Sequence, residues 1–199
     1  HNIYPVTVLY DGREDMGIHV NISGSAISFA IDCFYDSIKI ATPFGTYAVE
    51  YSDDTMMVRY LRHINECAKF TRIDLAIDDK GCNYYSVDDV REICDSDRCT
   101  TRFRKYRPEY ERSFNEGMTG NTLYIGKRLS EVFLRIYDKR LEQIQKSKKD
   151  VGFDWVRWEL ELKKERSNMA VQYLLFGKSL GAVAIGILSN YFRVIIRDN

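Results

Sequence analysis

Tyr137 is the residue whose sequence neighbours best suit a role as a nucleophile. It lies within residues 134–139, where aliphatic and polar side chains alternate. Because side chains two apart in a strand share a face, Arg135, Tyr137 and Lys139 are expected on one surface. A tyrosine with its ordinary pKa of about 10 is a poor nucleophile without cations, a base or a metal-polarised phosphate nearby. We therefore predict that Tyr137 attacks and that Arg135 and Lys139 stabilise the phenolate and the developing charge.

Two further segments, residues 72–78 and 155–162, alternate in the same way. If the three segments pair in one sheet, their aliphatic side chains can fill a core. These side chains are Ile73, Leu75, Ile77, Leu134, Ile136, Leu160 and Leu162. The opposite face then collects Asp74, Asp78, Glu159, Glu161, Arg135 and Tyr137. Carboxylates, an arginine and a tyrosine on one surface match the needs of metal-assisted attack on a phosphodiester.

Carboxylates on adjoining strands repel one another unless cations neutralise them. Arg72, Arg135 and Arg157 could do so, and exposed acids that only aid solubility are the alternative interpretation. A hard divalent cation bound by oxygens, Mg²⁺ or Mn²⁺, fits this set better than zinc. Among the three histidines, His19 either contributes one ligand or is a half-buried structural imidazole. Glu142, one helical turn beyond Tyr137, is a further ligand or base candidate, or an exposed helix residue.

A basic segment between residues 98 and 112 carries aromatic residues among its cations, and more cations follow from residue 127. Cations with aromatic residues between them suit phosphate contact and base stacking. A solvated strand and a solvated helix face are the alternative interpretation. The residues expected to contact DNA are Arg102, Arg104, Lys105, Lys127 and Arg128.

The composition indicates a folded protein that works in a reducing compartment. The chain has 199 residues, of which 45% are hydrophobic, and a formal net charge of zero, so any attraction to nucleic acid must be local. No apolar run approaches the roughly 20 residues that span a bilayer, and membrane insertion is not expected. Five scattered cysteines without a C-x-x-C pair favour reduced thiols in a cytoplasm.

The hydrophobic patterns predict an α+β fold with a largely antiparallel central sheet and helices packed on one face. Strands are predicted at residues 5–10, 17–22, 72–78, 121–126, 132–138 and 153–162, with another pair within residues 38–51. Helices are predicted at residues 25–34 and 54–70, from residue 86, after residue 138, from residue 167 and at residues 180–192. We expect one catalytic domain over residues 1–199. A loose internal duplication leaves two halves that share the sheet, residues 1–110 and 111–199, as the alternative.

Short motifs spread from residue 16 to residue 162 point to a family. They are residues 16–20 with Ser23-Gly24, residues 72–78, residues 122–126, residues 135–139 with Glu142, and residues 157–161. In this order they resemble the replication initiation factors of the Rep_trans type. That family includes rolling-circle plasmid initiators, phage initiators and relaxases of integrative conjugative elements.

The resemblance implies an enzyme that nicks one DNA strand at an origin through a tyrosine, stays attached to the 5′ phosphate and later reseals the strand. Tyr137 matches the position of the nucleophile, and the metal ligands carry over to Asp74, Glu142 and Glu159. The implied partners are single-stranded or cruciform origin DNA and a host helicase, and a homodimer is left open. DNA-recognition regions that flank such a domain are expected to lie outside this sequence.

A binding module without chemistry is the rival interpretation. It uses Tyr124, Tyr137 and the basic segment as a stacking platform for nucleic acid. It predicts salt-sensitive binding to DNA without cleavage.

Overall fold

The chain divides into two units, an N-terminal unit of residues 1–67 and a C-terminal unit of residues 68–199. The computed structural model describes residues 6–10, 12, 17–41 and 53–196. The alternative of two halves placed a boundary after residue 110. The division falls at residue 67 instead, because residue 110 lies inside a strand of the central sheet of the C-terminal unit.

The N-terminal unit combines a two-stranded sheet with two helices. β1 (Val6–Leu9) pairs antiparallel with β2 (His19–Ile22), and the short 3-10 helix η1 (Gly24–Ala26) leads into α1 (Ile27–Ala41). α2 (Asp53–Cys67) contacts α1 through Phe34, whose ring centroid lies 5.5 Å from that of Tyr60 and 5.1 Å from that of His63.

One sequence-based prediction in this unit is wrong. Strands were expected within residues 38–51, but residues 38–41 extend α1, and residues 42–51 lie outside the described residues. A short apolar run does not by itself distinguish a strand from a buried stretch of helix.

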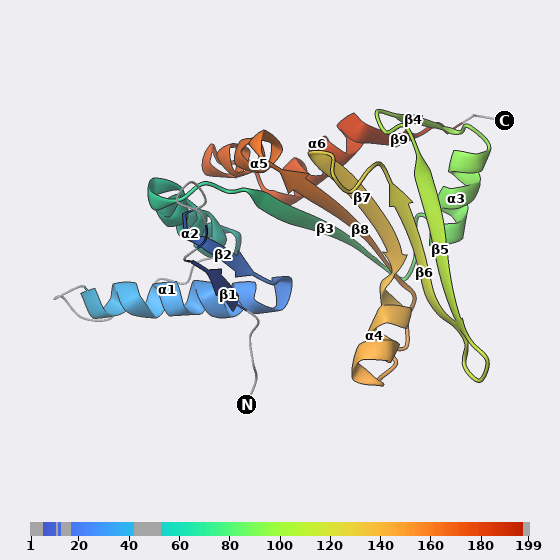
Figure 1. Ribbon diagram of the computed structural model, residues 1–199, viewed down its shortest axis with the longest axis horizontal. Coiled ribbons are helices and arrows are strands. Elements are labelled where there is room, and N and C mark those ends of the chain that lie inside the picture. Colours follow the sequence, from blue (N-terminus) through green and yellow to red (C-terminus); the bar gives the residue numbers. More distant parts are fainter. Residues whose placement is uncertain (1–5, 11, 13–16, 42–52, 197–199) are drawn as a thin grey trace. The chain divides into compact units, whose positions relative to one another are not determined.

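The C-terminal unit is built on a five-stranded sheet in the order β3-β8-β7-β6-β5, and every neighbouring pair is antiparallel (Figure 1). The strands are β3 (Arg72–Lys80), β5 (Tyr106–Ser113), β6 (Gly117–Ile125), β7 (Val132–Asp138) and β8 (Trp155–Lys163). The three alternating segments of the sequence therefore pair side by side, as β3, β8 and β7. The predicted α+β class and antiparallel sheet are confirmed.

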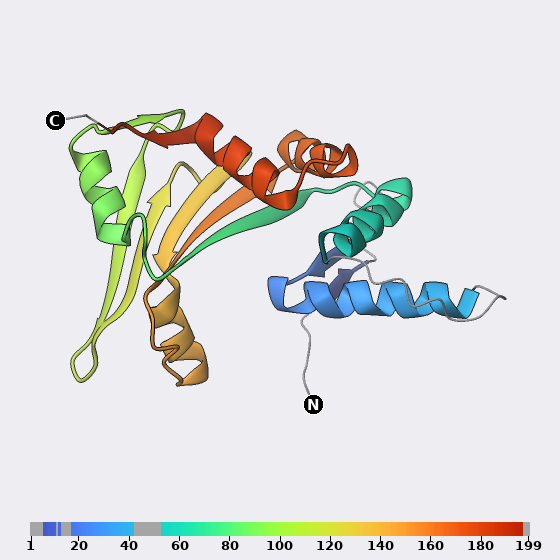
Figure 2. The same cartoon turned by 180° about the vertical axis from the view of Figure 1, so that it is seen from behind.

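Helices α3 (Val87–Asp95) and α6 (Leu180–Tyr191) lie on one face of this sheet (Figure 2). α4 (Lys139–Ser147) begins directly after β7, and α5 (Glu165–Leu175) follows β8. β4 (Cys99–Thr101) and β9 (Phe192–Val194) form a small separate antiparallel sheet. Ser86 and Asp138 begin α3 and α4 by accepting hydrogen bonds from backbone N–H groups of the first turn, which stabilises each helix start.

The core lies between the aliphatic face of the five-stranded sheet and the helices on that face, which include α3 and α6. Leu134, Ile136 and Leu162 are fully buried, and Leu160 is 1% exposed. Ile73 and Ile77 of the predicted core are only half-buried, because β3 is an edge strand. The predicted aliphatic face is confirmed.

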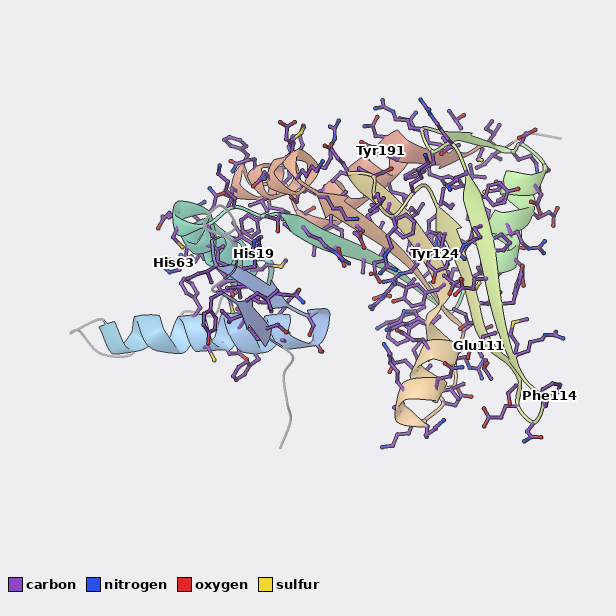
Figure 3. The ribbon with its side chains drawn as sticks, viewed as in Figure 1. His19, His63, Glu111, Phe114, Tyr124 and Tyr191 are labelled. Atoms are coloured by element: carbon purple, nitrogen blue, oxygen red, sulfur yellow. The ribbon has the colours of Figure 1, made fainter. Side chains whose placement is uncertain are left out.

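β5 forms the other edge of the sheet and pairs only with β6. Its residues from Tyr106 to Arg112 are exposed and include Pro108. The β5–β6 hairpin carries Phe114 near its tip, fully exposed (Figure 3). After β6, Gly126 adopts a φ of +97°, and a Cβ there would lie 2.7 Å from the Phe103 ring, so only glycine fits this turn.

None of the helices in the described ranges has the length and apolar character needed to cross a bilayer.

We predict that Leu160→Ala lowers the free energy of unfolding by about 2–5 kcal/mol, because it leaves a cavity in the core beneath the central strands. Leu129→Ala is the matched control, since Leu129 is 96% exposed and Leu160 is 1% exposed. The control should change stability by less than about 0.5 kcal/mol. Urea unfolding of both variants measures the difference, and equal losses would contradict this placement of the core.

Candidate active site

The register of the sheet gathers the predicted polar residues on one face. Tyr137 of β7 lies opposite Arg157 of β8, and Arg157 lies opposite Asp78 of β3. One step along, Arg135 lies opposite Glu159. We call this surface the tyrosine face; its members are Asp74, Asp78, Arg135, Tyr137, Arg157, Glu159 and Glu161. The prediction that acids, an arginine and the tyrosine share the face opposite the aliphatic core is confirmed.

Tyr137 is held by a hydrogen bond to a carboxylate. Its hydroxyl donates to Glu159 Oε2 at 3.1 Å, and the side chain is 8% exposed. The other oxygen of Glu159 accepts a hydrogen bond from Arg135. The Arg135 guanidinium carbon lies 5.4 Å from the centre of the Tyr137 ring. One carboxylate therefore links the phenol to the arginine.

Arg157, which lies directly across from Tyr137 on β8, is fixed by Asp78. Its Nε and Nη2 donate to the two oxygens of Asp78 at 2.6 and 2.8 Å, and Trp155 Nε1 donates to Asp78 at 2.8 Å. Burial opposes ionisation of Asp78, but the hydrogen bonds from Arg157 and Trp155 hold the pKa of its carboxyl below the ordinary value. The charge of Arg157 is thus locked next to the phenol.

Burial, followed by the negative charges of Glu159 and Glu142, raises the pKa of Tyr137 well above its ordinary value, while the charge of Arg157 acts in the opposite direction. At neutral pH the side chain is an uncharged phenol that donates its proton to Glu159. Because the folded protein holds the phenol proton more tightly than the unfolded chain does, the contribution of the buried phenol to stability is fully present below a pH of about 10 and is lost as the pH rises further.

Lys139 lies over the ring of Tyr137. It is 8% exposed, and its Nζ is 5.7 Å from the centre of the Tyr137 ring. It forms an ion pair with Glu142 of α4, which also accepts from Lys146 at 2.6 Å. Although burial opposes ionisation, the hydrogen bonds from Lys139 and Lys146 lower the pKa of Glu142. Lys139 lies near Tyr137, as predicted, but it also pairs with Glu142.

The three residues predicted as metal ligands each have a cationic partner. Glu159 pairs with Arg135, Glu142 with Lys139, and Asp74 with Arg72 at 2.6 Å. No group of three or more His, Cys, Asp and Glu side chains arranged to hold a metal occurs within residues 6–10, 12, 17–41 and 53–196. The structure therefore does not bring these three residues together as one ligand group. His19 lies on β2 of the N-terminal unit.

The acids of the tyrosine face come from strands in different positions of the sheet. Asp74 and Asp78 belong to β3, which is an edge strand. Glu161, on the interior strand β8, is 7% exposed and pairs with Arg72 at 2.8 Å. Arginines therefore neutralise the acids on this part of the face.

The residues predicted to contact DNA lie together at the opposite end of the sheet from Tyr137. We call this set the basic end: Arg102, Arg104, Lys105, Lys127 and Arg128. The loop before β5 meets the turn after β6 there, where Gly126 N–H donates to the Lys105 carbonyl at 2.8 Å. All five side chains are exposed, and none lies within 4.0 Å of a carboxylate in the part of the chain that the structure describes.

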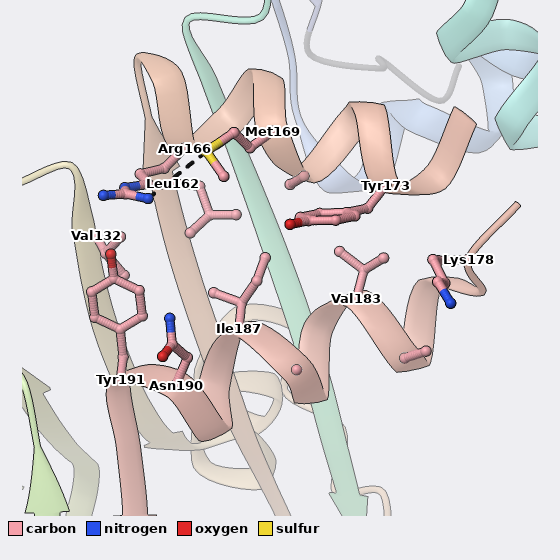
Figure 4. A pocket seen from close by; sticks show the side chains of 13 residues that line it. Val132, Leu162, Arg166, Met169, Tyr173, Lys178, Val183, Ile187, Asn190 and Tyr191 are labelled. Atoms are coloured by element: carbon pink, nitrogen blue, oxygen red, sulfur yellow. Dashed lines mark hydrogen bonds between the residues drawn. The ribbon is translucent and has the colours of Figure 1, made fainter. Parts of the chain in front are cut away.

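An apolar pocket of about 360 Å³ lies between α5 and α6, away from the tyrosine face (Figure 4). Its floor includes Val132 and Leu162, and Met169, Tyr173 and Ile187 line its walls. Val132 begins the strand near whose end Tyr137 lies, so this pocket is separate from the candidate nucleophile.

The sequence-based site omitted Trp155, and it named Arg157 only as one of the arginines that could neutralise the carboxylates, although both residues alternate with Glu159 in residues 155–161. Their role depends on Asp78, which is 79 residues away from Arg157 in the sequence. The alternation predicts the face on which they lie, but it does not predict that both donate hydrogen bonds to Asp78.

The fold and the site define an α+β protein whose antiparallel sheet presents a tyrosine hydrogen-bonded to a glutamate and flanked by two arginines. The family described as "Replication initiation factor" (Rep_trans) matches residues 68–199. This chain therefore belongs to the replication initiation factor family. The predicted family is confirmed, and the match covers the whole C-terminal unit.

Two relatives carry more specific names. The chain is 40% identical over 135 residues to the protein named DNA relaxase NicK of Bacillus subtilis (strain 168), a region that is 65% of this chain and 37% of that protein. It is also similar to the solved rolling circle replication initiator protein from Geobacillus stearothermophilus, at 26% identity and a TM-score of 0.70. That similarity covers 97% of this chain and 65% of the initiator. The chain thus spans less than two thirds of the length of either relative.

We predict that Glu159→Gln lowers the pKa of Tyr137, because it removes a negative charge next to the hydroxyl. The pKa should stay above that of free tyrosine, since burial, the larger cause, remains. Tyrosinate absorbance during a pH titration, taken as the difference between each protein and its Tyr137→Phe derivative, isolates this residue. Glu161→Gln, the same change two residues along the strand, is the control, and an equal shift in both variants would contradict the assigned cause.

Proposed function

We propose that this chain nicks and rejoins one strand of origin DNA through Tyr137, as a rolling-circle replication initiator or relaxase. The observation that carries the proposal is the hydrogen bond of 3.1 Å between Tyr137 and Glu159, on a face where Arg135 and Arg157 flank the phenol. Family membership and the two named relatives support the same activity.

In the proposed reaction Glu159 is the general base. The phenol proton moves from Tyr137 Oη to Glu159 Oε2 as Oη forms a bond to the scissile phosphorus. The bond between phosphorus and the 3′ oxygen breaks, and the 3′ oxygen leaves with a proton from solvent. The products are a 5′-phosphotyrosine and a free 3′ hydroxyl.

The cations around Tyr137 favour this reaction by stabilising negative charge. The charge of Arg157 opposes the rise in the pKa of the phenol, and Asp78, which also accepts from Trp155, holds the Arg157 guanidinium in place. Arg135 and Lys139 lie 5.4 and 5.7 Å from the ring centre, close enough to stabilise charge on the incoming phosphate. When the phosphate enters, these cations exchange part of their pairing with Glu159 and Glu142 for pairing with phosphate oxygens.

Rejoining is the same reaction in reverse. A 3′ hydroxyl attacks the phosphotyrosine, the bond between phosphorus and Tyr137 Oη breaks, and Glu159 returns the proton to the phenol. Because the phosphodiester energy is kept in the phosphotyrosine, no nucleotide cofactor is needed.

We also propose that Mg²⁺ or Mn²⁺ assists nicking, with Asp74, Glu142 and Glu159 as candidate ligands. A hard cation of this kind is usually held by only one or two carboxylates together with substrate phosphates, so a cluster of three acids is not required. Of the three candidates, Glu159 lies closest to the chemistry, because it contacts Tyr137 directly. Bound there, the cation would polarise the scissile phosphate.

Origin DNA in single-stranded or cruciform form is the proposed substrate, with the basic end contacting its phosphates. A host helicase as partner, a homodimer and a location in the cytoplasm are further proposals that rest on family membership.

We predict that Tyr137→Phe abolishes the covalent DNA adduct and leaves DNA binding within about twofold of the unchanged protein, because only the attacking oxygen is removed. Tyr124→Phe is the matched control, since Tyr124 lies on the same side of the neighbouring strand β6, opposite Arg135. The proteins are incubated with supercoiled plasmid carrying the origin of the chain's own genetic element, and protein-linked open circles are separated on a denaturing gel. An undiminished adduct in Tyr137→Phe would exclude Tyr137. Binding without nicking by the unchanged protein would favour the stacking platform.

The metal proposal makes a separate prediction. EDTA should stop nicking, and excess Mg²⁺ or Mn²⁺ should restore it. Glu159→Gln should raise the metal concentration needed for half of the full rate, because it weakens a ligand. Asp150→Asn is the control, since Asp150 pairs with Arg140 away from Tyr137. Full activity in EDTA would remove the metal from the mechanism.

A further inference from the structure

A polar pocket of about 300 Å³ lies beside the basic end. We call it the β4–β9 pocket; it is lined by Thr100, Thr101, Arg102, Ser189, Asn190 and Arg193. These residues come from β4, the loop that follows it, the end of α6 and β9. β4 and β9 pair with Thr100 opposite Arg193, so the small sheet brings together segments about 90 residues apart in the chain.

Several side chains that line the pocket have hydrogen-bond donors without a partner in the described part of the chain. Neither Arg102 nor Arg193 has a carboxylate within 4.0 Å in the described ranges, whereas Arg140 and Arg157 of the same unit are ion-paired. No hydrogen bond engages the Thr100 hydroxyl or the Ser189 hydroxyl among the residues that the structure describes. No carboxylate lines the pocket. The site therefore offers two positive charges and neutral donors to an anion.

The end of α6 would ordinarily oppose an anion here, because the last carbonyls of a helix carry partial negative charge. In this pocket the Ser189 and Tyr191 carbonyls already accept hydrogen bonds. Arg193 Nε donates to the Ser189 carbonyl, and the Tyr191 carbonyl accepts from Thr101 Oγ1 at 3.0 Å and from the Arg102 N–H at 3.0 Å. These bonds leave the outer nitrogens of both guanidinium groups for a ligand.

The two arginines are also held in place. The Arg102 guanidinium carbon lies 5.7 Å from the centre of the Tyr191 ring, and Phe103 packs against the same ring at 5.6 Å between centroids. Arg193 is anchored through its Nε. Two guanidinium groups fixed beside free hydroxyls suit the oxygens of a phosphate better than a single flexible lysine does.

We propose that the β4–β9 pocket binds a backbone phosphate of the DNA strand, away from the phosphate that Tyr137 attacks. This inference rests on the proposed function, which supplies the DNA. The basic end adjoins the pocket through Arg102, and it lies at the end of the sheet where β7 begins. Tyr137 is five residues further along β7, or about 17 Å of strand. A strand held at both places would be fixed in register over several nucleotides.

The test uses a fluorescent single-stranded origin oligonucleotide and proteins that carry Tyr137→Phe, so that binding is measured without cleavage. The test variant is Arg102→Ala with Arg193→Ala. The control is Arg62→Ala with Lys69→Ala, which removes the same charge from two exposed residues outside the pocket and outside the basic segment. Thermal melting followed by circular dichroism checks that all variants are folded.

We expect the test variant to bind roughly tenfold more weakly or worse, and the control to lose much less. The slope of log affinity against log salt should fall by about 0.7 in the test variant, the value for one phosphate contact on a single strand. Oligonucleotides with one neutral methylphosphonate at each position in turn then locate the contact. At one position that is distant from the scissile phosphate, the methylphosphonate should weaken binding to the protein with an unchanged pocket. The same methylphosphonate should not change binding to the test variant.

Equal losses in test and control variants, or no such position in the scan, would overturn the proposed pocket. In that case nicking by the protein with Tyr137 intact would still support the proposed function. If the protein neither binds nor nicks origin DNA, the proposed function fails first, so the two failures can be told apart.

Discussion

The register of β7 against β8 is the constraint on which the site depends. With Tyr137 opposite Arg157 and Arg135 opposite Glu159, every second side chain of both strands enters the core and the others meet on the tyrosine face. A slip of one residue would exchange the two sets and place the phenol among aliphatic side chains. The buried Leu134, Ile136 and Leu160 make that slip costly. The same contacts that stabilise the fold therefore set the geometry of the candidate active site.

Charge on the tyrosine face is organised as pairs rather than as separate clusters. Each acid contacts an arginine or lysine from its own or an adjacent element: Glu159 with Arg135, Asp78 with Arg157, and Glu142 with Lys139. Half-buried pairs of this kind lose stability when one partner is removed, because the remaining charge is left unpaired. They also give a phosphate a ready set of cations, provided that the acids release them. In the proposed reaction, a phosphate that binds to this face therefore replaces carboxylates as the partner of these cations and does not fill an empty positive site.

Much of this organisation follows from the sequence, because alternation over seven or more residues determines both strand and face. The sheet of β3, β8 and β7 and the shared face of Tyr137 and Glu159 were predictable on that ground. The edge position of β3 was not, since pattern alone does not give strand order. The cationic partners of Asp74 and Glu142 depend on side-chain geometry, and the β4–β9 pocket depends on residues about 90 positions apart. Residues 38–41 were misassigned because a short apolar run fits either a strand or a helix.

The outermost strand β5 has a consequence for how copies of this chain meet. An exposed edge strand is a template that neighbouring molecules can extend, which is the usual start of β-sheet aggregation. Pro108 sits in the middle of β5 and lacks an N–H, and charged residues such as Arg107, Glu109 and Glu111 follow one another along this edge. A sixth strand added there would lose a ladder bond and bring charges together. These residues of β5 thereby oppose extension of the sheet at this edge and leave the face that carries Tyr137 unchanged.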